Sequence, residues 1–357
     1  MNFAYVLLFI LLILTIAFLF ILSNFNYFGS KYGGVNKLKN KKMNDSNKVK
    51  AVKEKEMNLV SQPRWNEFKV SRELVKYIKT VPQYHQYELR KILERYLIYI
   101  SQTDADPLVA TNTLKSELLA KGMRYYPNIE RILKMKFITP AGAKLVVSEN
   151  GENVNFKYGD NEVGFTTKPR YQILRKLGTD EEILLSLMRY ESLLPSGQQW
   201  AVPINEYRRY VKDYDVTVEG FASPFNSQLL RLADEFPDNS FQFCSLFPEL
   251  DQPFGSIGNF FTQSDFQGKS VVVNPPFIED ILKRAAEKCI NVLETGPGKF
   301  IFIGPAWTDA VFYTALAKSK YLVSSRHFKT HYENHLGQEI KSTFESVEFI
   351  LERKVEK

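Results

Sequence analysis

Residues 270–277 read Ser-Val-Val-Val-Asn-Pro-Pro-Phe, a short apolar run that stops at a polar turn, and a helical pattern follows over 278–293. Three consecutive Val residues are typical of a buried strand, and Pro ends it because Pro has no N–H for the ladder. Similar patterns surround it: 216–221, 241–245, 300–303, 321–325 and 346–352 are strand-like, and 227–236 and 308–317 are helical. Strands that alternate with helices predict an α/β fold with a mainly parallel sheet, whose ligands bind at the carboxyl ends of the strands.

The quartet 274–277 suits chemistry on a heterocyclic amine. Such an amine is a poor nucleophile because its lone pair is delocalised into the ring, so an enzyme that alkylates it needs acceptors for the two N–H bonds. The side-chain carbonyl of Asn274 and the backbone carbonyl between Pro275 and Pro276 can accept them, since neither Pro donates an N–H. The ring of Phe277 can stack on a flat base. A turn that merely precedes a helix is the alternative.

Two further loops follow predicted strands. Residues 218–226 read Val-Glu-Gly-Phe-Ala-Ser-Pro-Phe-Asn and end the first strand of the alternating region, where a loop backbone can approach a cofactor. This loop is similar to the Phe-Ala-Gly-x-Gly loop that binds S-adenosylmethionine in amino-methyltransferases, with Ser223 and Phe225 in place of the Gly residues. Glu249 and Asp251 lie beyond the second strand, where a doubly wound fold usually holds a ribose diol. Two solvated loop acids are the alternative.

The order of these motifs closely resembles the phosphorylated-CTD-interacting-factor family of cap-specific adenosine N6-methyltransferases. The matching motifs are 221–226, then Cys244-Ser245-x-Phe247-Pro248-Glu249-x-Asp251-x-x-Phe254-Gly255-Ser256, then 274–277. The resemblance covers about residues 165–352. It implies a Rossmann-like class I methyltransferase core, S-adenosylmethionine as cofactor, and capped RNA as partner, with the N6 amine of the cap-adjacent 2′-O-methyladenosine as acceptor.

The resemblance also implies roles for particular residues. The adenine would be held by Asn274, Pro275, Pro276 and Phe277. The cofactor would be bound by Glu219, Phe221, Ala222, Ser223, Pro224, Asn226, Glu249 and Asp251. Weaker matches place Trp307, His331 and Tyr332 at the substrate. We expect no WW module in this chain, so the family's polymerase-targeting role is not carried over.

The net charge of +7 is unevenly distributed along the chain. Residues 31–56 and 61–140 each carry +6, whereas residues 141–357 carry −5. The region 61–140 is largely helical in pattern, and its basic side chains, Lys134 and Lys136 among them, can attract RNA phosphates without demanding a sequence. A plain packing module is the alternative. A hairpin with Asn150-Gly151 at its turn follows it. A helix is predicted over 180–194, with Thr179 as its N-cap and Glu182 as the capping-box partner.

Residues 3–22 form an apolar run long enough, at about 30 Å in a helix, to cross a bilayer. Basic residues follow it, and such flanks stay cytoplasmic, so we expect a single-pass membrane protein whose body faces the cytoplasm. A cleaved signal peptide is the alternative. The predicted organisation is a transmembrane anchor at 1–28, a basic flexible tether at 29–60, a helical domain with a β-hairpin at 61–164, and a Rossmann-like methyltransferase domain at 165–357.

The sequence predicts no metal site. His327, His331 and His335 recur every four residues and could share a helix face, but no Cys or acid completes a familiar ligand set. Two other functions remain open. One is an amino-methyltransferase that acts on DNA adenine or a protein amide, because Asn-Pro-Pro-aromatic motifs occur in both classes. The other is a catalytically inactive, membrane-tethered RNA-binding relative, which the replaced Gly residues would permit.

Overall fold

The computed structural model describes residues 58–354, except 103 and 198. The predicted anchor at 1–28 and almost all of the predicted tether lie outside the described residues. Within the part that is described, no helix combines the length and the apolar character needed to cross a membrane. The prediction of a single-pass membrane protein with a membrane as its partner is therefore not supported, and we correct it here.

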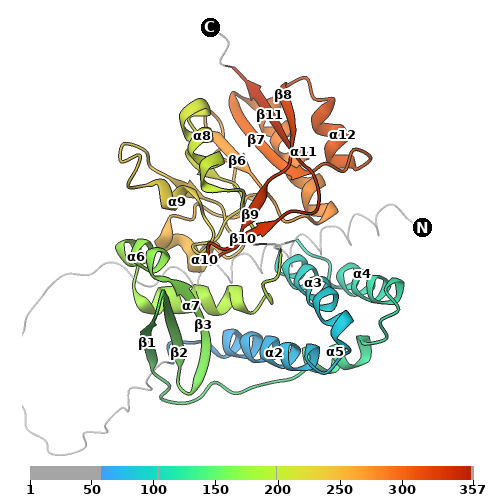
Figure 1. Ribbon diagram of the computed structural model, residues 1–357, viewed down its shortest axis with the longest axis vertical. Helices are drawn as coiled ribbons and strands as arrows, with labels where there is room; N and C mark the ends of the chain where they lie inside the picture. The colour runs from blue at the N-terminus through green and yellow to red at the C-terminus, as the bar shows by residue number, and fades with distance from the viewer. Residues whose placement is uncertain (1–57, 103, 198, 355–357) are drawn as a thin grey trace, which may run out of the picture. The chain divides into compact units, whose positions relative to one another are not determined.

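Four helices make up the first part of the described chain (Figure 1). They are α2 (Gln62–Ile78), α3 (Gln83–Ile100), α4 (Pro107–Ala120) and α5 (Tyr126–Leu133). Their apolar faces share one buried cluster around Leu74, Leu89 and Leu118. The side chain of Asp106 accepts hydrogen bonds from the first N–H groups of α4 and so fixes where that helix begins.

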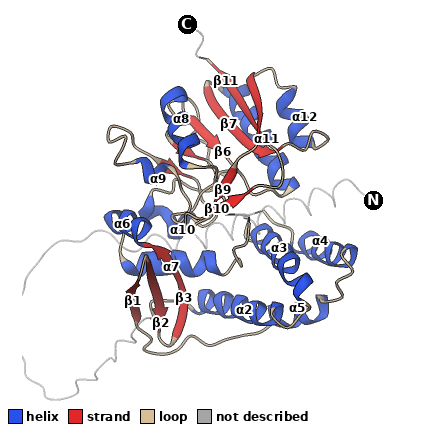
Figure 2. Ribbon diagram, in the orientation of Figure 1, coloured by secondary structure: helices blue, strands red, loops and turns tan. Residues whose placement is uncertain are grey.

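A three-stranded antiparallel sheet follows the helices (Figure 2). It comprises β1 (Leu145–Asn150), β2 (Asn153–Tyr158) and β3 (Asn161–Thr167). The predicted hairpin is present, with Gly151 at a φ of +58° in its turn. The third strand was not predicted, and the expected domain boundary at 164/165 falls inside it. Helix α6 (Lys168–Leu177) and helix α7 (Asp180–Glu191) come next, and Thr179 and Glu182 form the predicted capping box of α7.

The large sheet has six strands in the order β5-β4-β6-β7-β11-β8. They are β4 (Val218–Glu219), β5 (Gln242–Phe243), β6 (Ser270–Val273), β7 (Gly298–Pro305), β8 (Leu322–Phe328) and β11 (Ser346–Arg353). The first four in this order pair in parallel, whereas β11 is antiparallel to both of its neighbours. The fold is thus mixed α/β with a mixed sheet, because β11 enters between β7 and β8.

The remaining elements connect or flank these strands. They are α8 (Ile204–Tyr214), α9 (Leu229–Leu232), α10 (Pro248–Asp251), a 3₁₀ turn (Gln252–Phe254), α11 (Glu279–Thr295), α12 (Val311–Ala317), β9 (His331–Glu333) and β10 (Glu339–Lys341). The three His residues predicted to share a helix face do not, because His327 lies in β8, His331 in β9 and His335 in the turn after β9. The extended backbone there separates them.

The strand order creates a crevice beside β4. Strand β4 lies between β5 and β6, so the next strand in sequence, β5, pairs with one edge of β4, and β6 pairs with the other edge. At such a reversal the loops beyond the strands diverge, which leaves space for a ligand. The side chains of Val271, Val272 and Val273 are fully buried, so β6 is anchored in the core on both faces and holds the following turn in place.

Candidate functional site

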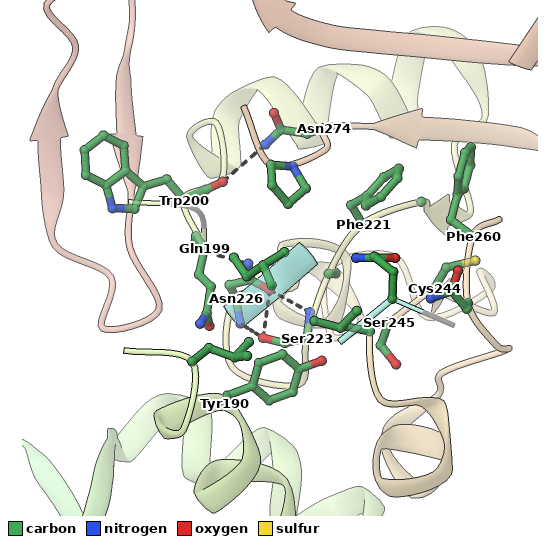
Figure 3. A pocket seen from close by; sticks show the side chains of 18 residues that line it. Tyr190, Gln199, Trp200, Phe221, Ser223, Asn226, Cys244, Ser245, Phe260 and Asn274 are labelled. Carbon is green, nitrogen blue, oxygen red and sulfur yellow. Dashed lines mark hydrogen bonds between the residues drawn. The ribbon is translucent and has the colours of Figure 1, made fainter. Parts of the chain in front are cut away.

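A cavity of about 620 Å³, open to solvent, lies where β4, β5 and β6 end (Figure 3). Its lining combines the loops after these three strands and includes Gly220, Ala222, Ser223, Cys244, Ser245 and Asn274. Cofactor sites are usually concave with a few polar groups, and this lining has that character. The three motifs that are distant in sequence therefore meet at one place.

Asn274 lines this cavity, and one of its two amide atoms is buried without a hydrogen-bond partner. Its Nδ2 atom donates to the backbone carbonyl of Trp200 at 3.3 Å, which only an N–H group can do, so the amide orientation is determined. The residue is only 8% exposed, and its Oδ1 atom is buried without a hydrogen-bond partner. A buried acceptor without a partner carries an energetic cost, which a donor on a bound ligand would remove.

The rest of the quartet lies beside an aromatic groove. Pro275, Pro276 and Phe277 line it together with Trp200 and Tyr332. The rings of Phe277 and Tyr332 meet edge to face with centroids 5.9 Å apart. Tyr332 shares a hydrogen bond of 2.7 Å with Ser346, and burial raises the pKa of its phenol to about 12. The phenol therefore stays neutral, and the groove offers flat apolar surfaces to which a base can bind.

The loop after β4 is held by its own polar groups. The backbone N–H of Ser223 and its hydroxyl both donate to Oδ1 of Asn226, at 2.7 and 2.9 Å. Nδ2 of Asn226 donates to the backbone carbonyl of Gln199 at 3.2 Å. A Cβ atom on Gly220 would lie 3.0 Å from the Phe260 ring, so only Gly fits there without displacement. Phe221 and Ala222 also line the cavity, and Pro224 is buried within the same loop.

Glu219 does not line the cavity. It is fully buried, and its carboxylate accepts hydrogen bonds from the Ser227 hydroxyl at 2.8 Å and the Gln228 backbone N–H at 3.1 Å. Burial raises the pKa of this carboxyl to about 7. Its contacts tie the end of β4 to the start of α9, and so they fix both ends of the loop 220–226. A direct cofactor contact by Glu219 stays a prediction.

Glu249 and Asp251 also lie outside the cavity lining. Asp251 is completely buried and accepts hydrogen bonds from the Ser186 hydroxyl at 2.6 Å and the Tyr190 hydroxyl at 2.7 Å. Burial raises the pKa of Asp251 to about 7. Because Tyr190 does line the cavity, Asp251 acts on the site by orienting that ring. Glu249 is exposed and pairs with Arg64 at 2.6 Å. Cofactor binding by either acid stays a prediction.

The loop between α7 and α8 supplies residues that the sequence reasoning missed. Gln199 and Trp200 line the cavity, and Nε2 of Gln199 is buried without a hydrogen-bond partner. The Glu94 carboxylate of α3 accepts the backbone N–H groups of Ser196 and Gly197, both at 2.8 Å. The helical part thus holds this loop against the site. The signal available in the sequence was Trp200, one of only three Trp residues, in a segment with no assigned element.

The remaining predicted substrate residues lie elsewhere. Trp307 follows β7, is 40% exposed and packs edge to face on Phe312. His331 lies in β9, 3.5 Å from Glu339. Lys134 is the residue directly after α5 and pairs with Glu130 at 2.8 Å, and Lys136, two residues further along the chain, is exposed. None of them lines the cavity, and their substrate roles stay predictions. Among the described residues, no group of His, Cys, Asp and Glu side chains could hold a metal ion.

A known family model matches the central part of the chain. Residues 174–337 match the family model described as "Phosphorylated CTD interacting factor 1 WW domain". All three motifs, 221–226, 244–256 and 274–277, fall inside this range, so the match supports the resemblance found in the sequence. The expected absence of a WW module is not supported, because the matching model carries that description.

Two curated relatives match part of the chain. The "mRNA (2'-O-methyladenosine-N(6)-)-methyltransferases" of Homo sapiens and Mus musculus are each 29% identical over 116 residues. These residues are 32% of this chain and 15% of each relative, so the chain spans only a small part of their length. Among solved structures, the crystal structure of TrmN from Thermus thermophilus gives a TM-score of 0.28 at 12% identity, over 71% of this chain and 70% of that one.

Proposed function

We propose that this chain is an S-adenosylmethionine-dependent methyltransferase with a Rossmann-like class I core, which methylates the N6 amine of the cap-adjacent 2′-O-methyladenosine of mRNA. The observation that carries the proposal is the buried, unpartnered Oδ1 of Asn274 at the carboxyl end of β6. The names of the two mammalian relatives and the family match support the same substrate class.

The geometry around Asn274 suits activation of an amine. Oδ1 of Asn274 and the carbonyl of Pro275 are acceptors for the two N–H bonds of an adenine N6 group, which directs the nitrogen lone pair toward an electrophile. Trp200 fixes the Asn274 side chain through its backbone carbonyl, so the acceptor is oriented before the substrate arrives. Such preorganised polar groups contribute to catalysis without rearranging during the reaction.

The chemistry of the cavity lining suits the cofactor. S-adenosylmethionine supplies an electrophilic methyl group when it is bound. The loop 220–226 would approach it closely, because Gly220 has no side chain there and the loop is braced by the Ser223–Asn226 hydrogen bonds. The buried Nε2 of Gln199, which has no partner, is a free donor for a carboxylate or a heterocycle. Ser245 offers a hydroxyl from the loop after β5.

Orientation accounts for most of what this site contributes. Methyl transfer from a sulfonium needs little acid–base assistance, so the site has to align the two reacting atoms and exclude water. Trp200 and Phe277, which are partly exposed, supply flat surfaces for the acceptor base beside Asn274, and the buried Tyr332 ring supports Phe277. Stacking on such side chains is worth about 1–3 kcal/mol per base.

Mass spectrometry of nucleosides provides the test. The full chain is incubated with S-adenosylmethionine and RNA that carries a 7-methylguanosine cap followed by 2′-O-methyladenosine. We expect N6-methylation of that adenosine, and less with RNA that lacks the cap. Methylation of DNA adenine or of a protein amide without any methylation of capped RNA would overturn the proposal in favour of another amino-methyltransferase. Failure to bind S-adenosylmethionine at millimolar concentration would favour a catalytically inactive RNA-binding protein.

A further inference from the structure

A second cavity lies on another side of the loop that follows β4. It has about 990 Å³ of space open to solvent, and its lining includes Arg170 of α6, Gln228 and Arg231 at α9, and Asn334 and His335 between β9 and β10. These elements can be followed in Figure 1. Most of its lining residues carry polar or charged side chains, in contrast to the aromatic groove beside Asn274.

Arg170 is the unusual residue of this cavity. It is only 7% exposed, yet its Nη1 atom has no hydrogen-bond partner. Burial first, and the nearby Arg231 second, lower the pKa of its guanidinium to about 10. Buried charges are normally paired, because leaving water is costly. A guanidinium that is buried and incompletely paired is therefore prepared for an anion that enters the cavity.

Arg231 supplies a second guanidinium in a fixed position. Its Nη1 donates to Oε1 of Gln228 at 2.7 Å and to Oε2 of Glu333 at 2.5 Å. Gln228 donates to the same Glu333 oxygen at 3.0 Å. Glu333 is thus engaged by Arg231, which leaves Arg170 without an ion pair among the described residues. The cavity also has one exposed acid, Glu152, on its lining.

His335 contributes a polar group without charge. Burial first, and Arg90 second, lower the pKa of its imidazole to about 4, so the ring is neutral near pH 7 and can donate one hydrogen bond. Two guanidinium groups and one imidazole supply hydrogen-bond donors to this lining. Such a set matches phosphoryl oxygens, which Arg binds through paired N–H groups.

We propose that this second cavity binds phosphate groups through Arg170 and Arg231, and that its occupant is the 5′ phosphate chain of the RNA whose adenosine lies at Asn274. The link to the first site is Asn226, which lines both cavities. The two cavities therefore adjoin at this side chain. This inference rests on the proposed function. A free nucleotide offers the same phosphate chemistry, and the test separates the two sources.

The first test measures binding of inorganic triphosphate to the full chain by calorimetry. We expect Arg170→Met to weaken binding about tenfold to hundredfold, as for other charge-assisted hydrogen bonds, and Arg231→Gln to weaken it as well. Arg170→Lys, which keeps a positive charge, should retain part of the affinity. Arg208→Gln is the matched control. Arg208 lies on α8, pairs with Glu235 and lines neither cavity. Circular dichroism verifies that each variant is folded.

The second test identifies the source of the phosphates. If the occupant is RNA, Arg170→Met raises the KM for capped RNA and leaves the KM for RNA with a 5′ hydroxyl unchanged. A folded Arg170→Met that binds triphosphate as wild type does, or a wild type that does not bind it at millimolar concentration, overturns the phosphate site. If the wild type binds GTP and Arg170→Met leaves the KM for capped RNA unchanged, the site binds a free nucleotide, and the proposal that RNA occupies it is overturned. Loss of triphosphate binding in a protein that methylates no RNA supports the cavity and removes the proposed function.

Discussion

Nδ2 of Asn274 donates a hydrogen bond to the backbone carbonyl oxygen of Trp200 at 3.3 Å, across 74 residues of sequence. This bond joins the turn after β6 to the loop between α7 and α8. Because the amide nitrogen is engaged, the amide oxygen is left as a buried acceptor without a partner. The orientation of the proposed reactive group therefore depends on a loop that belongs neither to the large sheet nor to the quartet 274–277.

Asn274→Ala should abolish methyl transfer. The substitution removes an acceptor for the N6 amine, and we expect kcat to fall about 100-fold or more, as it does when one preorganised polar group is lost from an active site. Binding of S-adenosylmethionine, measured by calorimetry, should change little. Asn205→Ala on α8 is the control, because Asn205 is exposed and far from the cavity lining. A turnover near that of wild type in Asn274→Ala would disprove the role of Asn274.

Trp200→Ala should weaken RNA binding more than Trp200→Phe. The Trp200 ring lines the aromatic groove, and a Phe ring keeps a stacking surface that Ala removes. We expect the KM for capped RNA to rise about tenfold in the Ala variant, from the usual worth of one base stack, and less in the Phe variant. Steady-state kinetics at saturating cofactor measure both. Trp307→Ala serves as the comparison, and an effect confined to Trp307 would shift the base site toward the end of β7.

The free energy of unfolding should decrease as the pH rises from about 5 to about 7. The pKa values of Asp251 and Glu219 are raised by burial to about 7 in the folded protein, above the usual range of the unfolded chain. Between these values the folded state holds protons that the unfolded state has released, so stability is greatest at low pH and is lost as the pH approaches 7. Each carboxyl contributes a slope of roughly 1.4 kcal/mol per pH unit.

Urea denaturation of Asp251→Asn across this pH range isolates the contribution of one group. In Asp251→Asn the free energy of unfolding should fall less steeply with pH than in wild type, because one of the two titrating carboxyls is gone. Asp234→Asn should leave this slope unchanged, because Asp234 is exposed and pairs with Lys176 on the surface. An identical slope in Asp251→Asn and wild type would contradict the assigned titration.

Charge reversal of Lys134 and Lys136 tests the helical region as an RNA surface. If both contact phosphates, the double change to Glu should weaken RNA binding and reduce the slope of log affinity against log salt by about 1.4, from about 0.7 per contact on single strands. Fluorescence anisotropy at several salt concentrations measures both quantities. Lys318→Glu with Lys320→Glu is the matched control, since these exposed residues have the same spacing at the end of α12. Equal effects of the two pairs would assign the loss to net charge alone.

Elements with strong local signals were predicted well. The run of Val residues predicted β6 with the bounds that the structure has, and the Thr179–Glu182 spacing predicted the start of α7. The strands predicted over 216–221 and 241–245 are present as β4 and β5, but each is only two residues long. β3 was missed because Gly164 and two Thr residues interrupt its apolar pattern. The antiparallel direction of β11 depends on where its apolar faces pack, which a local pattern does not contain.

The site was predictable where a motif coincides with the end of a strand. Asn274 and the loop 221–226 lie at the cavity for this reason. Glu219 and Asp251 have motif positions near the cavity, yet their carboxylates are buried against α9 and α7, since nearby hydroxyl and N–H groups engage them. Gln199 and Trp200 were not predicted, because their place depends on a tertiary contact with Glu94 on α3.

The position of β11 has a consequence during protein synthesis. β11 is the last strand of the described chain, yet it occupies the place between β7 and β8. While the ribosome makes the chain between β7 and β11, at about 5–20 residues per second, the edge of β7 stays unpaired for a time on the order of seconds. That edge carries Phe300, Ile301, Phe302 and Ile303 in succession, an apolar run with the features of an aggregation-prone segment. Nascent chains stalled before residue 346 should therefore be clients of chaperones that bind exposed strands.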